Sequence, residues 1–358
     1  MRLLFVIQGL QSGGAERVMS VLCNSFSEKG HEVLLGLTER TDVIAYELNP
    51  NIKILDLRCQ CGNTISFFLK SAGNIRTAID RYKPEVVISF ITRANICSIL
   101  GSLGKNVPVI VSERNNPTID PPSKITRTIR RLIYPLAKGY VFQTNYAKEY
   151  FCKSIQNRGT VIYNPIDDKI FQLPLRERQK RVIAVGRLEP QKNFSLLINA
   201  FAEAQLKHPD YILDIYGEGS LKDKLQEQII KGGLYNIVHL KGHTDNTFDE
   251  LASSRIFALS SNYEGMPNAL MEAMCMGCAC VSTDAPAYGA RELIIDGVSG
   301  YLVPIGDKNV LVEKLSFLMG NENLQKMMSI EAIKVREKVK SEIIVNKWLD
   351  YINKVIQR

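Results

Sequence analysis

Several features that would identify a whole class of protein are missing from this sequence. No stretch approaches the roughly 20 consecutive apolar residues needed to cross a bilayer, so no membrane-spanning helix is predicted. The chain has 8 cysteines in 358 residues, too few for a disulfide-rich secreted fold. The apolar start, Leu3–Ile7, lacks the length and the small-residue cleavage site of a signal peptide, which predicts a cytosolic chain.

Common motifs of metal and nucleotide chemistry are also absent. The chain has no D-x-D sequence, so no metal is expected to be required. The glycines of Gln8–Arg17 fit neither G-x-G-x-x-G nor a P-loop with its lysine, which argues against a dinucleotide oxidoreductase and a P-loop ATPase. Cys275, Cys278 and Cys280 form a C-x-x-C-x-C cluster, but no second cluster at zinc spacing accompanies it. Buried free thiols are therefore favoured over a metal site.

The positive charge is concentrated in the first half of the chain. The whole sequence has 45 Lys and Arg against 37 Asp and Glu, a net charge of +8. Residues 1–165 hold 21 basic and 12 acidic residues, a net charge of +9, and residues 166–358 hold 24 and 25, a net charge of −1. Basic chains bind nucleic acid, anionic membranes or phosphate-rich ligands. A nucleic-acid-binding protein is disfavoured because no recognisable binding motif is present and the second half is nearly neutral.

Apolar runs of strand length alternate with helical patterns along both halves of the chain. In the first half the predicted strands are Leu3–Ile7, Glu32–Leu37, Val86–Phe90, Val107–Ser112 and Tyr140–Gln143. In the second half they are Val182–Val185, Tyr211–Tyr216, Ile237–Leu240, Ile256–Ser260 and Ala279–Thr283. Such alternation predicts parallel sheets with helices on both faces.

The restart of this pattern near residue 182 predicts an α/β protein of two doubly wound, Rossmann-like domains that face each other across a cleft. The predicted domains are residues 1–165 and 166–335, with a linker near Tyr163–Pro165 and Leu173–Arg181. A polar helical segment, Glu331–Arg358, ends the chain, and its residues 336–358 are expected to pack back on the body, on the first domain as one option. Ligands of such sheets bind at the carboxyl ends of the strands, so the cleft is the expected site.

Two loops at such strand ends suit an anion. Gly13 and Gly14 open a helix after the first strand, where backbone N–H groups can approach an anion at the positive end of the helix dipole. A tight turn that needs glycine explains this segment equally well. Arg187 and Lys192 follow the first strand of the second domain, and two cations there suit a diphosphate. Two surface cations are the alternative.

The most specific motif is YEGMPNALMEAM, which contains Glu264 and, after seven intervening residues, Glu272. The two glutamates flank a Gly-x-Pro turn and the start of a helix, whose N–H groups can contact a phosphate. Glu272, about one turn into the helix, can accept hydrogen bonds from ribose hydroxyls, and Glu264 precedes the turn, where it would face the reacting sugar. Capping of its own helix is the alternative for Glu272.

Together these motifs resemble glycosyltransferase family four, the retaining family with the GT-B fold, over nearly the whole chain. The resemblance implies sugar transfer from a nucleotide diphosphate sugar, most simply a UDP-sugar, with Glu264, Arg187 and Lys192 as the catalytic residues and no cofactor. Other donor-binding residues that it implies are Gly13 and Gly14 near the diphosphate, the backbone of Met266, Pro267, Asn268, Ala269 and Leu270 at phosphate, Glu272 at the ribose, and His243 beside the nucleobase. In the family, the leaving phosphate is thought to take the acceptor proton, while the glutamate positions the sugar.

One position departs from the family pattern. Many members carry a histidine near the donor sugar, and the matching stretch here is VSERNNP, with Arg114 at that place. Arg114 cannot act as a base because its pKa lies above any working pH. It is interpreted as a phosphate or sugar contact.

The resemblance also suggests a membrane-facing first domain that binds the acceptor. Basic residues there have apolar neighbours, a pattern that suits an anionic membrane surface or a lipid diphosphate, although solvated surface helices explain it too. The candidates are Lys70, Arg76, Lys124, Arg127, Arg130 and Arg131.

The chain is similar to bacterial transferases of capsule, exopolysaccharide and glycan assembly, including N-acetylgalactosaminyltransferases. A lipid-linked glycan is therefore the expected acceptor, at the cytoplasmic face of the inner membrane. A soluble acceptor, or a non-catalytic subunit of the same fold, remain alternatives.

Overall fold

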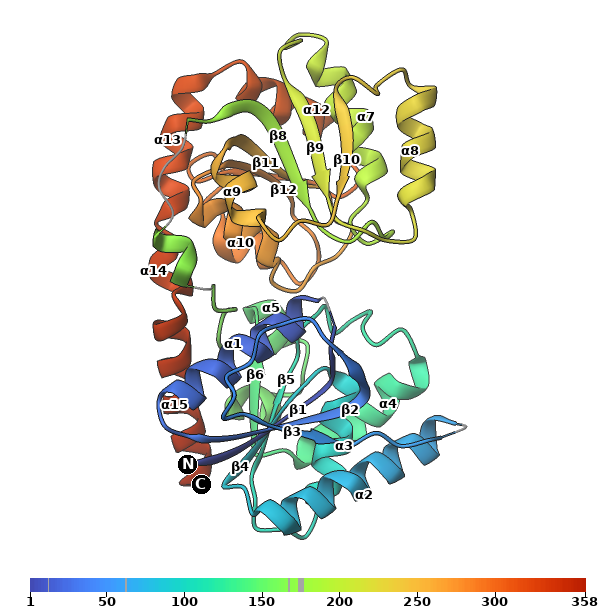
Figure 1. The fold of residues 1–358 in the computed structure, drawn as a ribbon, viewed down its shortest axis with the longest axis vertical. Helices are drawn as coiled ribbons and strands as arrows, with labels where there is room; N and C mark the ends of the chain where they lie inside the picture. Colours follow the sequence, from blue (N-terminus) through green and yellow to red (C-terminus); the bar gives the residue numbers. More distant parts are fainter. Residues whose placement is uncertain (12, 62, 167, 173–176) are drawn as a thin grey trace. The chain divides into compact units, whose positions relative to one another are not determined.

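The computed structural model describes residues 1–11, 13–61, 63–166, 168–172 and 177–358. The chain divides into two compact units (Figure 1): unit 1 comprises Met1–Pro165 with Lys340–Arg358, and unit 2 comprises Ile166–Val339. Each unit contains one parallel β-sheet, which confirms the predicted α/β class. Residues 173–176 of the predicted linker lie outside the described residues. That a cleft lies between the two units stays a prediction.

Unit 1 has a sheet of seven strands in the order β3-β2-β1-β4-β5-β6-β7, with every neighbouring pair parallel. The strands are β1 (Arg2–Leu10), β2 (Glu32–Ile44), β3 (Lys53–Asp56), β4 (Val86–Phe90), β5 (Val109–Ser112), β6 (Gly139–Phe142) and β7 (Gly159–Val161). The helices are α1 (Gly14–Glu28), α2 (Thr64–Tyr82), α3 (Thr92–Ser102), α4 (Lys124–Ile133), α5 (Asn145–Glu149), α6 (Lys153–Arg158) and α15 (Ser341–Ile356), with a short 3₁₀ helix η1 (Tyr134–Leu136).

Side-chain alternation along β1 builds a core on each face of this sheet. Leu3 and Phe5 point to the face covered by α1 and α15, whereas Leu4 and Val6 point to the face covered by α2 and α3. All four side chains are fully buried, as is Trp348 on α15. The last helix of the chain is therefore part of the core of unit 1.

Unit 2 has a sheet of six parallel strands in the order β10-β9-β8-β11-β12-β13. Figure 1 shows α7, α8 and α12 on one face and α9 and α10 on the other. The strands are β8 (Gln179–Val185), β9 (Ile212–Tyr216), β10 (Val238–Gly242), β11 (Ser254–Leu259), β12 (Ala279–Thr283) and β13 (Tyr301–Val303). The helices are α7 (Phe194–Gln205), α8 (Lys222–Lys231), α9 (Thr247–Ala252), α10 (Asn268–Cys275), α11 (Gly289–Leu293), α12 (Lys308–Met319), α13 (Glu322–Ile333) and α14 (Arg336–Val339), with a 3₁₀ helix η2 (Asp168–Gln172).

The predicted helical segment Glu331–Arg358 is helical over most of its length, but it is divided into separate helices. It contains the end of α13, then α14, and then α15, which begins at Ser341. Lys340 between the last two has φ −51° and ψ 133°, outside the helical region. The chain passes from unit 2 to unit 1 at this residue. The sequence has no proline or glycine at this break.

Candidate active site

The sheet of unit 2 brings two of the predicted motifs to one place. Strands β8 and β11 are neighbours at its centre, with Ile256 paired to Val182, and the chain winds towards β10 after the first and towards β13 after the second. Ligands of doubly wound sheets bind where the connections diverge in this way. The loop after β8 carries Arg187 and Lys192, and the loop after β11 carries Glu264.

Lys192 and Glu264 form an ion pair at this point. The Nζ atom of Lys192 donates to Oε1 of Glu264 at 2.6 Å, and the two side chains are only 14% and 10% exposed. The hydroxyl of Ser261 donates to the same oxygen at 2.7 Å. A Cβ atom on Gly186 would lie 2.9 Å from Cε of Lys192, so the glycine leaves room for the lysine chain. The sequence placed both residues in the site but did not predict their pairing.

Amide side chains join the two loops into one framework. The side chain of Gln191 donates to the carbonyl of Tyr263 at 2.9 Å, and the N–H of Asn262 donates to the carbonyl of Gln191 at 2.8 Å. The amide of Asn193 donates to the side chain of Asn262 at 3.1 Å. Asn193 has φ 47°, a left-handed conformation that asparagine tolerates better than most residues. Sequence reasoning missed these residues because their partners lie about 70 positions away.

Arg187 is exposed at the start of the same loop. Among the described residues, no carboxylate lies within ion-pair distance of it, so its charge is available to a ligand. The loops after β8 and β9 touch through glycines: Gly217 has φ 140°, and a Cβ atom there would lie 2.0 Å from the carbonyl oxygen of Gly186. Only glycine fits this approach, which holds the base of the Arg187 loop against its neighbour.

The start of α10 lies at the carboxyl end of β11, where phosphate contacts were predicted. Pro267 is the N-cap residue and supplies no side-chain hydrogen bond to the first turn. The positive end of the helix dipole therefore favours an anion there. Met266 and Leu270 are buried, and their packing holds in place the chain between them, which includes Asn268 and Ala269. Glu272 is 3% exposed on the same helix.

The loop after β12 supports the Glu264 loop. Ala287 and Tyr288 have positive φ angles of 77° and 54°, and Gly289 follows them. A Cβ atom on Gly289 would lie 1.9 Å from the carbonyl oxygen of Gly265. The N–H of Glu264 donates to a carbonyl in this loop at 3.4 Å. Close backbone packing between the two loops therefore holds Glu264 in position, and the sequence motif alone does not predict this packing.

His243 lies at the same edge of the sheet, just after β10. It is exposed, and its Nε2 atom lies 3.2 Å from a carboxylate oxygen of Asp245. The N–H of Gly217 donates to the carbonyl of Gly242 at 2.8 Å, which ties this loop to the loop after β9. One strand, β9, separates His243 from the strand that leads to Lys192.

The glycine motif of unit 1 differs from its prediction. The N–H of Gly13 donates to the hydroxyl of Tyr46 at 2.9 Å, and that hydroxyl donates to the carbonyl of Gly13 at 2.8 Å. A Cβ atom on Gly13 would lie 2.3 Å from a carboxylate oxygen of Glu16, so this carboxylate lies against the start of α1. The Gly13 N–H, expected to approach an anion, is thus already engaged, while Gly14 begins the helix. Ser12, which precedes the two predicted glycines, lies outside the described residues.

Arg114 follows β5, and its guanidinium carbon lies 4.2 Å from the centre of the Phe90 ring at the end of β4. Burial lowers the pKa of Arg114 to about 9, which leaves it protonated at neutral pH. The preceding residue, Glu113, is buried, and its carboxylate accepts from the hydroxyls of Tyr134 and Thr92. Burial raises the pKa of Glu113.

The predicted basic surface divides into exposed and structural residues. Arg130 is only 1% exposed: it lies 3.5 Å from Glu113 and donates to the carbonyls of Pro117 and Asp120 at 2.6 and 2.7 Å. Its assignment to a membrane-facing surface is wrong, because this side chain holds the loop after β5 from inside the unit. Arg127 donates to carbonyls of the same loop.

The other predicted cations remain at the surface. Lys124 and Arg131 on α4 are exposed, as are Lys70 and Arg76 on α2. Lys70 donates to the carbonyl of Gln60 at 3.2 Å, and Arg76 to a carbonyl after α3 at 2.7 Å. No helix in the described part of the chain is long and apolar enough to cross a membrane.

The cysteine cluster lies in the core of unit 2. Cys275, Cys278 and Cys280 are all buried, and burial raises the pKa of the first two to about 12. Within residues 1–11, 13–61, 63–166, 168–172 and 177–358, no group of three His, Cys, Asp or Glu side chains could hold a metal ion. That the reaction requires no metal stays a prediction.

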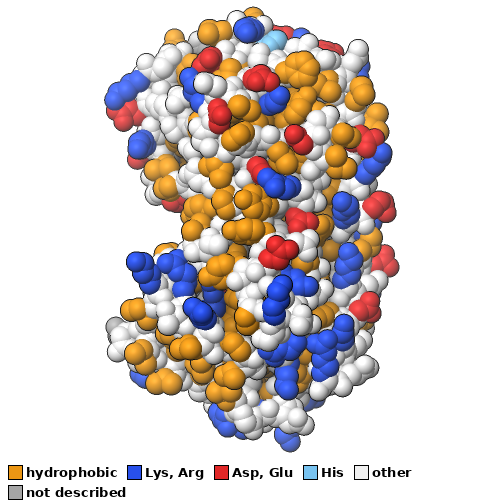
Figure 2. All heavy atoms as spheres, turned by 180° about the vertical axis from the view of Figure 1, so that it is seen from behind, with side chains coloured by type: hydrophobic (Ala, Val, Ile, Leu, Met, Phe, Trp, Pro, Cys, Tyr) orange, Lys and Arg blue, Asp and Glu red, His pale blue; other side chains and the backbone are white. Residues whose placement is uncertain are grey.

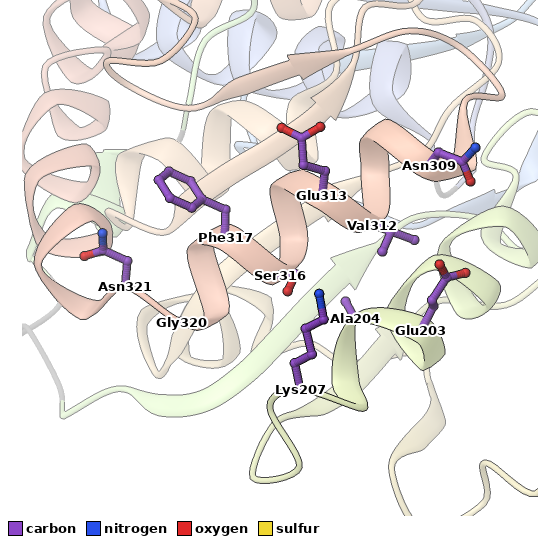
Figure 3. A pocket seen from close by; sticks show the side chains of 10 residues that line it. All are labelled: Glu203, Ala204, Lys207, Asn309, Val312, Glu313, Ser316, Phe317, Gly320 and Asn321. Carbon is purple, nitrogen blue, oxygen red and sulfur yellow. The ribbon is translucent and has the colours of Figure 1, made fainter.

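A separate pocket of about 590 Å³ lies in unit 2 between α7 and α12. Figure 3 shows its lining, with Glu203 from α7 and Lys207 just after that helix on the side of α12 that carries Val312 and Ser316. None of the predicted site residues lines it. It lies against the helices, away from the loops at the carboxyl ends of the strands.

Comparison with known proteins identifies the class of protein. Residues 12–170 match the family described as Glycosyltransferase Family 4, and residues 165–335 match the family described as Glycosyl transferases group 1. The chain therefore belongs to glycosyltransferase family 4, and it is a glycosyltransferase. This confirms the predicted family and reaction class.

Two relatives come from Campylobacter jejuni. An alpha-1,4-N-acetyl-D-galactosaminyltransferase named for a diNAcBac-PP-undecaprenol-linked glycan is 28% identical over 99% of both chains. An N-acetylgalactosamine-N,N'-diacetylbacillosaminyl-diphospho-undecaprenol 4-alpha-N-acetylgalactosaminyltransferase is 31% identical over 89% of this chain and 90% of its own. Among solved structures, Anabaena HepE in complex with UDP and glucose has a TM-score of 0.81 at 17% identity, covering 99% of this chain and 100% of its own. That likeness confirms the GT-B fold.

Proposed function

We propose that this enzyme transfers a hexose or N-acetylhexosamine, with retained configuration, from a UDP-sugar to a lipid-linked glycan in bacterial surface polysaccharide or glycan assembly. The observation that carries the proposal is the Lys192–Glu264 pair at the carboxyl ends of β8 and β11, with exposed Arg187 in the same loop. A cation beside a carboxylate suits a reaction that separates a leaving diphosphate from a sugar of cationic character.

Each charged group of unit 2 has a part in this reaction. Arg187, Lys192 and the first turn of α10 stabilise the negative charge that builds on the departing diphosphate. Glu264 holds the donor sugar and stabilises the positive charge on it, without forming a bond to it. Glu272 holds the ribose, and His243 lies beside the base. The leaving phosphate takes the proton of the acceptor hydroxyl. The protein supplies the positive charge, so no metal ion or other cofactor is needed for this step.

The acceptor is assigned from the relatives. Both Campylobacter enzymes are named for glycans on an undecaprenyl diphosphate, and they match this chain nearly end to end. We assign acceptor binding to residues 1–165 because this half carries the net charge of +9. A transferase with a soluble acceptor is the first alternative, and a non-catalytic subunit that only binds a sugar nucleotide is the second.

A transfer assay separates these alternatives. The enzyme is incubated with a panel of UDP- and GDP-sugars and one glycan, presented either on undecaprenyl diphosphate or free in solution. Transfer of one UDP-sugar to the lipid-linked glycan alone supports the proposal. Equal transfer to the free glycan supports a soluble acceptor, and UDP binding without any transfer supports the non-catalytic subunit. Product analysis by NMR reports whether the configuration is retained.

The same proposal includes peripheral attachment to an anionic membrane through α4. Ile125 and Leu132 are seven residues apart, which puts them on one side of the helix, and they are 67% and 70% exposed. Lys124 and Arg131, also seven apart, flank them and are exposed. Figure 2 shows blue Lys and Arg side chains among orange hydrophobic ones over unit 1, the lower part of that view. Exposed apolar side chains flanked by cations suit a surface of anionic lipid.

Flotation with liposomes tests this attachment. Wild-type protein is expected to float with vesicles that contain phosphatidylglycerol and to remain behind with phosphatidylcholine alone. Leu132→Asp is expected to abolish flotation. The matched control is Leu206→Asp in unit 2, because Leu206 is 79% exposed and lies outside the basic half. Equal flotation with charged and uncharged vesicles, or unchanged flotation of Leu132→Asp, contradicts the attachment. Neither result contradicts the assignment as a transferase.

A further inference from the structure

Two cysteines of unit 1 have their sulfur atoms close to bonding distance. The Sγ atom of Cys61 lies 3.0 Å from the Sγ atom of Cys59, about 1 Å more than the length of a disulfide bond. Both are free thiols, and both are partly buried. They form a C-x-C sequence in the segment that follows β3, and neither has a part in the proposed transfer reaction.

Helix α2 fixes the segment that carries the pair. The side-chain amide of Asn74 donates to the carbonyls of residues 57 and 58 at 3.2 and 2.9 Å. The Nζ atom of Lys70 donates to the carbonyl of Gln60, between the two cysteines, at 3.2 Å. The backbone is thus held on both sides of Cys59. The short distance between the two sulfur atoms therefore follows from the way this segment packs on the helix.

The two thiols have different surroundings. The Sγ atom of Cys59 lies 3.2 Å from the hydroxyl oxygen of Ser71, a residue that is fully buried on α2. Burial, and then the contact with Cys61, raise the pKa of the Cys59 thiol. The thiolate is the nucleophile in thiol–disulfide exchange, so a reaction with an outside disulfide begins more readily at Cys61. Cys59 is then the neighbour that completes it.

We propose that Cys59 and Cys61 form a reversible dithiol–disulfide couple that exchanges with a small disulfide such as oxidised glutathione. The Cys61 thiolate attacks one sulfur of the glutathione disulfide, that S–S bond breaks, and one glutathione leaves as a thiol with the proton of Cys61. The Cys59 thiolate then attacks the Sγ atom of Cys61, and the second glutathione leaves with the proton of Cys59. Two protein thiols are oxidised, and one disulfide is reduced to two thiols.

A bond at this place is suited to exchange rather than to holding the fold together. It closes a loop of only three residues, and the stabilisation from a cross-link grows with the length of the loop that it closes. Both sulfur atoms are partly exposed, and exposed disulfides are more often labile or regulatory than structural. Lys70, which binds the carbonyl between the two cysteines, links the couple to the helix that carries predicted acceptor-side cations.

Peptide mass spectrometry of the full chain tests the couple. Trypsin cleaves after Arg58 and Lys70, so residues 59–70 form one peptide that contains both cysteines of the pair and no other cysteine. The protein is equilibrated with mixtures of oxidised and reduced glutathione, and free thiols are then blocked. The oxidised peptide should lack two hydrogen atoms and carry no blocking group. Because each bond formed releases two glutathione molecules, a tenfold rise in reduced glutathione should lower the ratio of oxidised to reduced peptide about 100-fold.

Serine variants separate the two steps. Cys59→Ser keeps a hydroxyl beside Ser71 and removes the second thiol, so a glutathione adduct should accumulate at Cys61, whereas in the wild type it should not. Cys152 is the matched control, because it is exposed and its Sγ atom lies 3.3 Å from the hydroxyl of Ser154 instead of a thiol. Cys152 should therefore stop at the adduct, and Cys152→Ser should leave the bond in the 59–70 peptide unchanged.

Three results overturn the proposal. One is a glutathione adduct on the wild-type 59–70 peptide without the internal bond, and another is a peptide whose thiols stay reduced in every glutathione mixture. The third is a cross-link to Cys97 on α3, which is fully buried and whose pKa burial raises to about 12. None of these measurements requires sugar transfer, so failure of the proposed function is distinguished from failure of the couple.

Discussion

Replacing Lys192 with methionine should reduce both stability and catalysis, by amounts that the structure allows us to estimate. The substitution keeps most of the side-chain volume over Gly186 and removes the ammonium group 2.6 Å from Glu264. The carboxylate is then left 10% exposed with the Ser261 hydroxyl as its remaining hydrogen-bond donor in this cluster. Breaking a buried pair by removing one partner costs about 3–5 kcal/mol, and the residual exposure places this case near about 3 kcal/mol.

The assay combines thermal unfolding with kinetics. For a domain of this size about 1 kcal/mol corresponds to a shift of about 2–4 °C, so the Tm of unit 2 should fall by about 6–12 °C. Adding Glu264→Gln removes the stranded charge, and the double variant should recover about 2 kcal/mol of the loss. The kcat value should fall by about 100- to 1000-fold, because a cation directed at the leaving group is lost.

Two results would refute this reasoning. A Tm within about 2 °C of the wild type would mean that the pair contributes little to the loop framework. Additive losses in the double variant would mean that Lys192 and Glu264 are not coupled. Lys222→Met is the control for the loss of a lysine, because Lys222 forms a solvent-exposed pair with Glu218 at 3.1 Å. Its Tm should not change measurably.

Three further predictions follow from local geometry. Gly289→Ala should lower both Tm and kcat, because its Cβ atom would lie 1.9 Å from a carbonyl oxygen of the loop after β11; unchanged kinetics would show that this loop adjusts freely. In native protein, mass spectrometry after iodoacetamide treatment should find Cys152 labelled first, since it is exposed and the Ser154 hydroxyl lowers its pKa, and buried Cys278, whose pKa is raised to about 12, labelled much more slowly. Because burial raises the pKa of Glu113, the folded state keeps its proton longer than the unfolded state, and stability should fall as pH rises above the usual carboxyl pKa of about 4.5. Urea unfolding at several pH values measures this fall in stability, which should be smaller in Glu113→Gln than in the wild type. An equal dependence of stability on pH in the two proteins would contradict the prediction.

Much of the fold could be predicted because strands buried on both faces have a strong sequence signal. Val86–Phe90 and Ala279–Thr283 were predicted with the bounds that the structure has, since each is a continuous apolar or small-residue run followed by a helix. Strands β3 and β13 were missed because they have four and three residues and lie at sheet edges, where burial demands little of the sequence. Short edge strands have too little pattern to be distinguished from loops.

The candidate site was predicted as a set of separate motifs rather than as an arrangement. The sequence showed that Arg187, Lys192 and Glu264 follow strands. That the two loops lie close together depends on β8 being next to β11 in the sheet. Arg130 shows the limit of charge patterns: its spacing on α4 is that of a surface residue, yet it is buried because the loop after β5 folds over it.

The sequence by itself determined the α/β class, the family, the concentration of positive charge in residues 1–165 and the loops that carry the chemistry, because these follow from local periodicity and from motifs a few residues long. Only the tertiary structure decided which charges are paired. Lys192 meets Glu264, Glu113 turns inward, and two nitrogens of Arg114 have no hydrogen-bond partner among the described residues, because pairing depends on strand order and loop packing between residues that are distant in the chain.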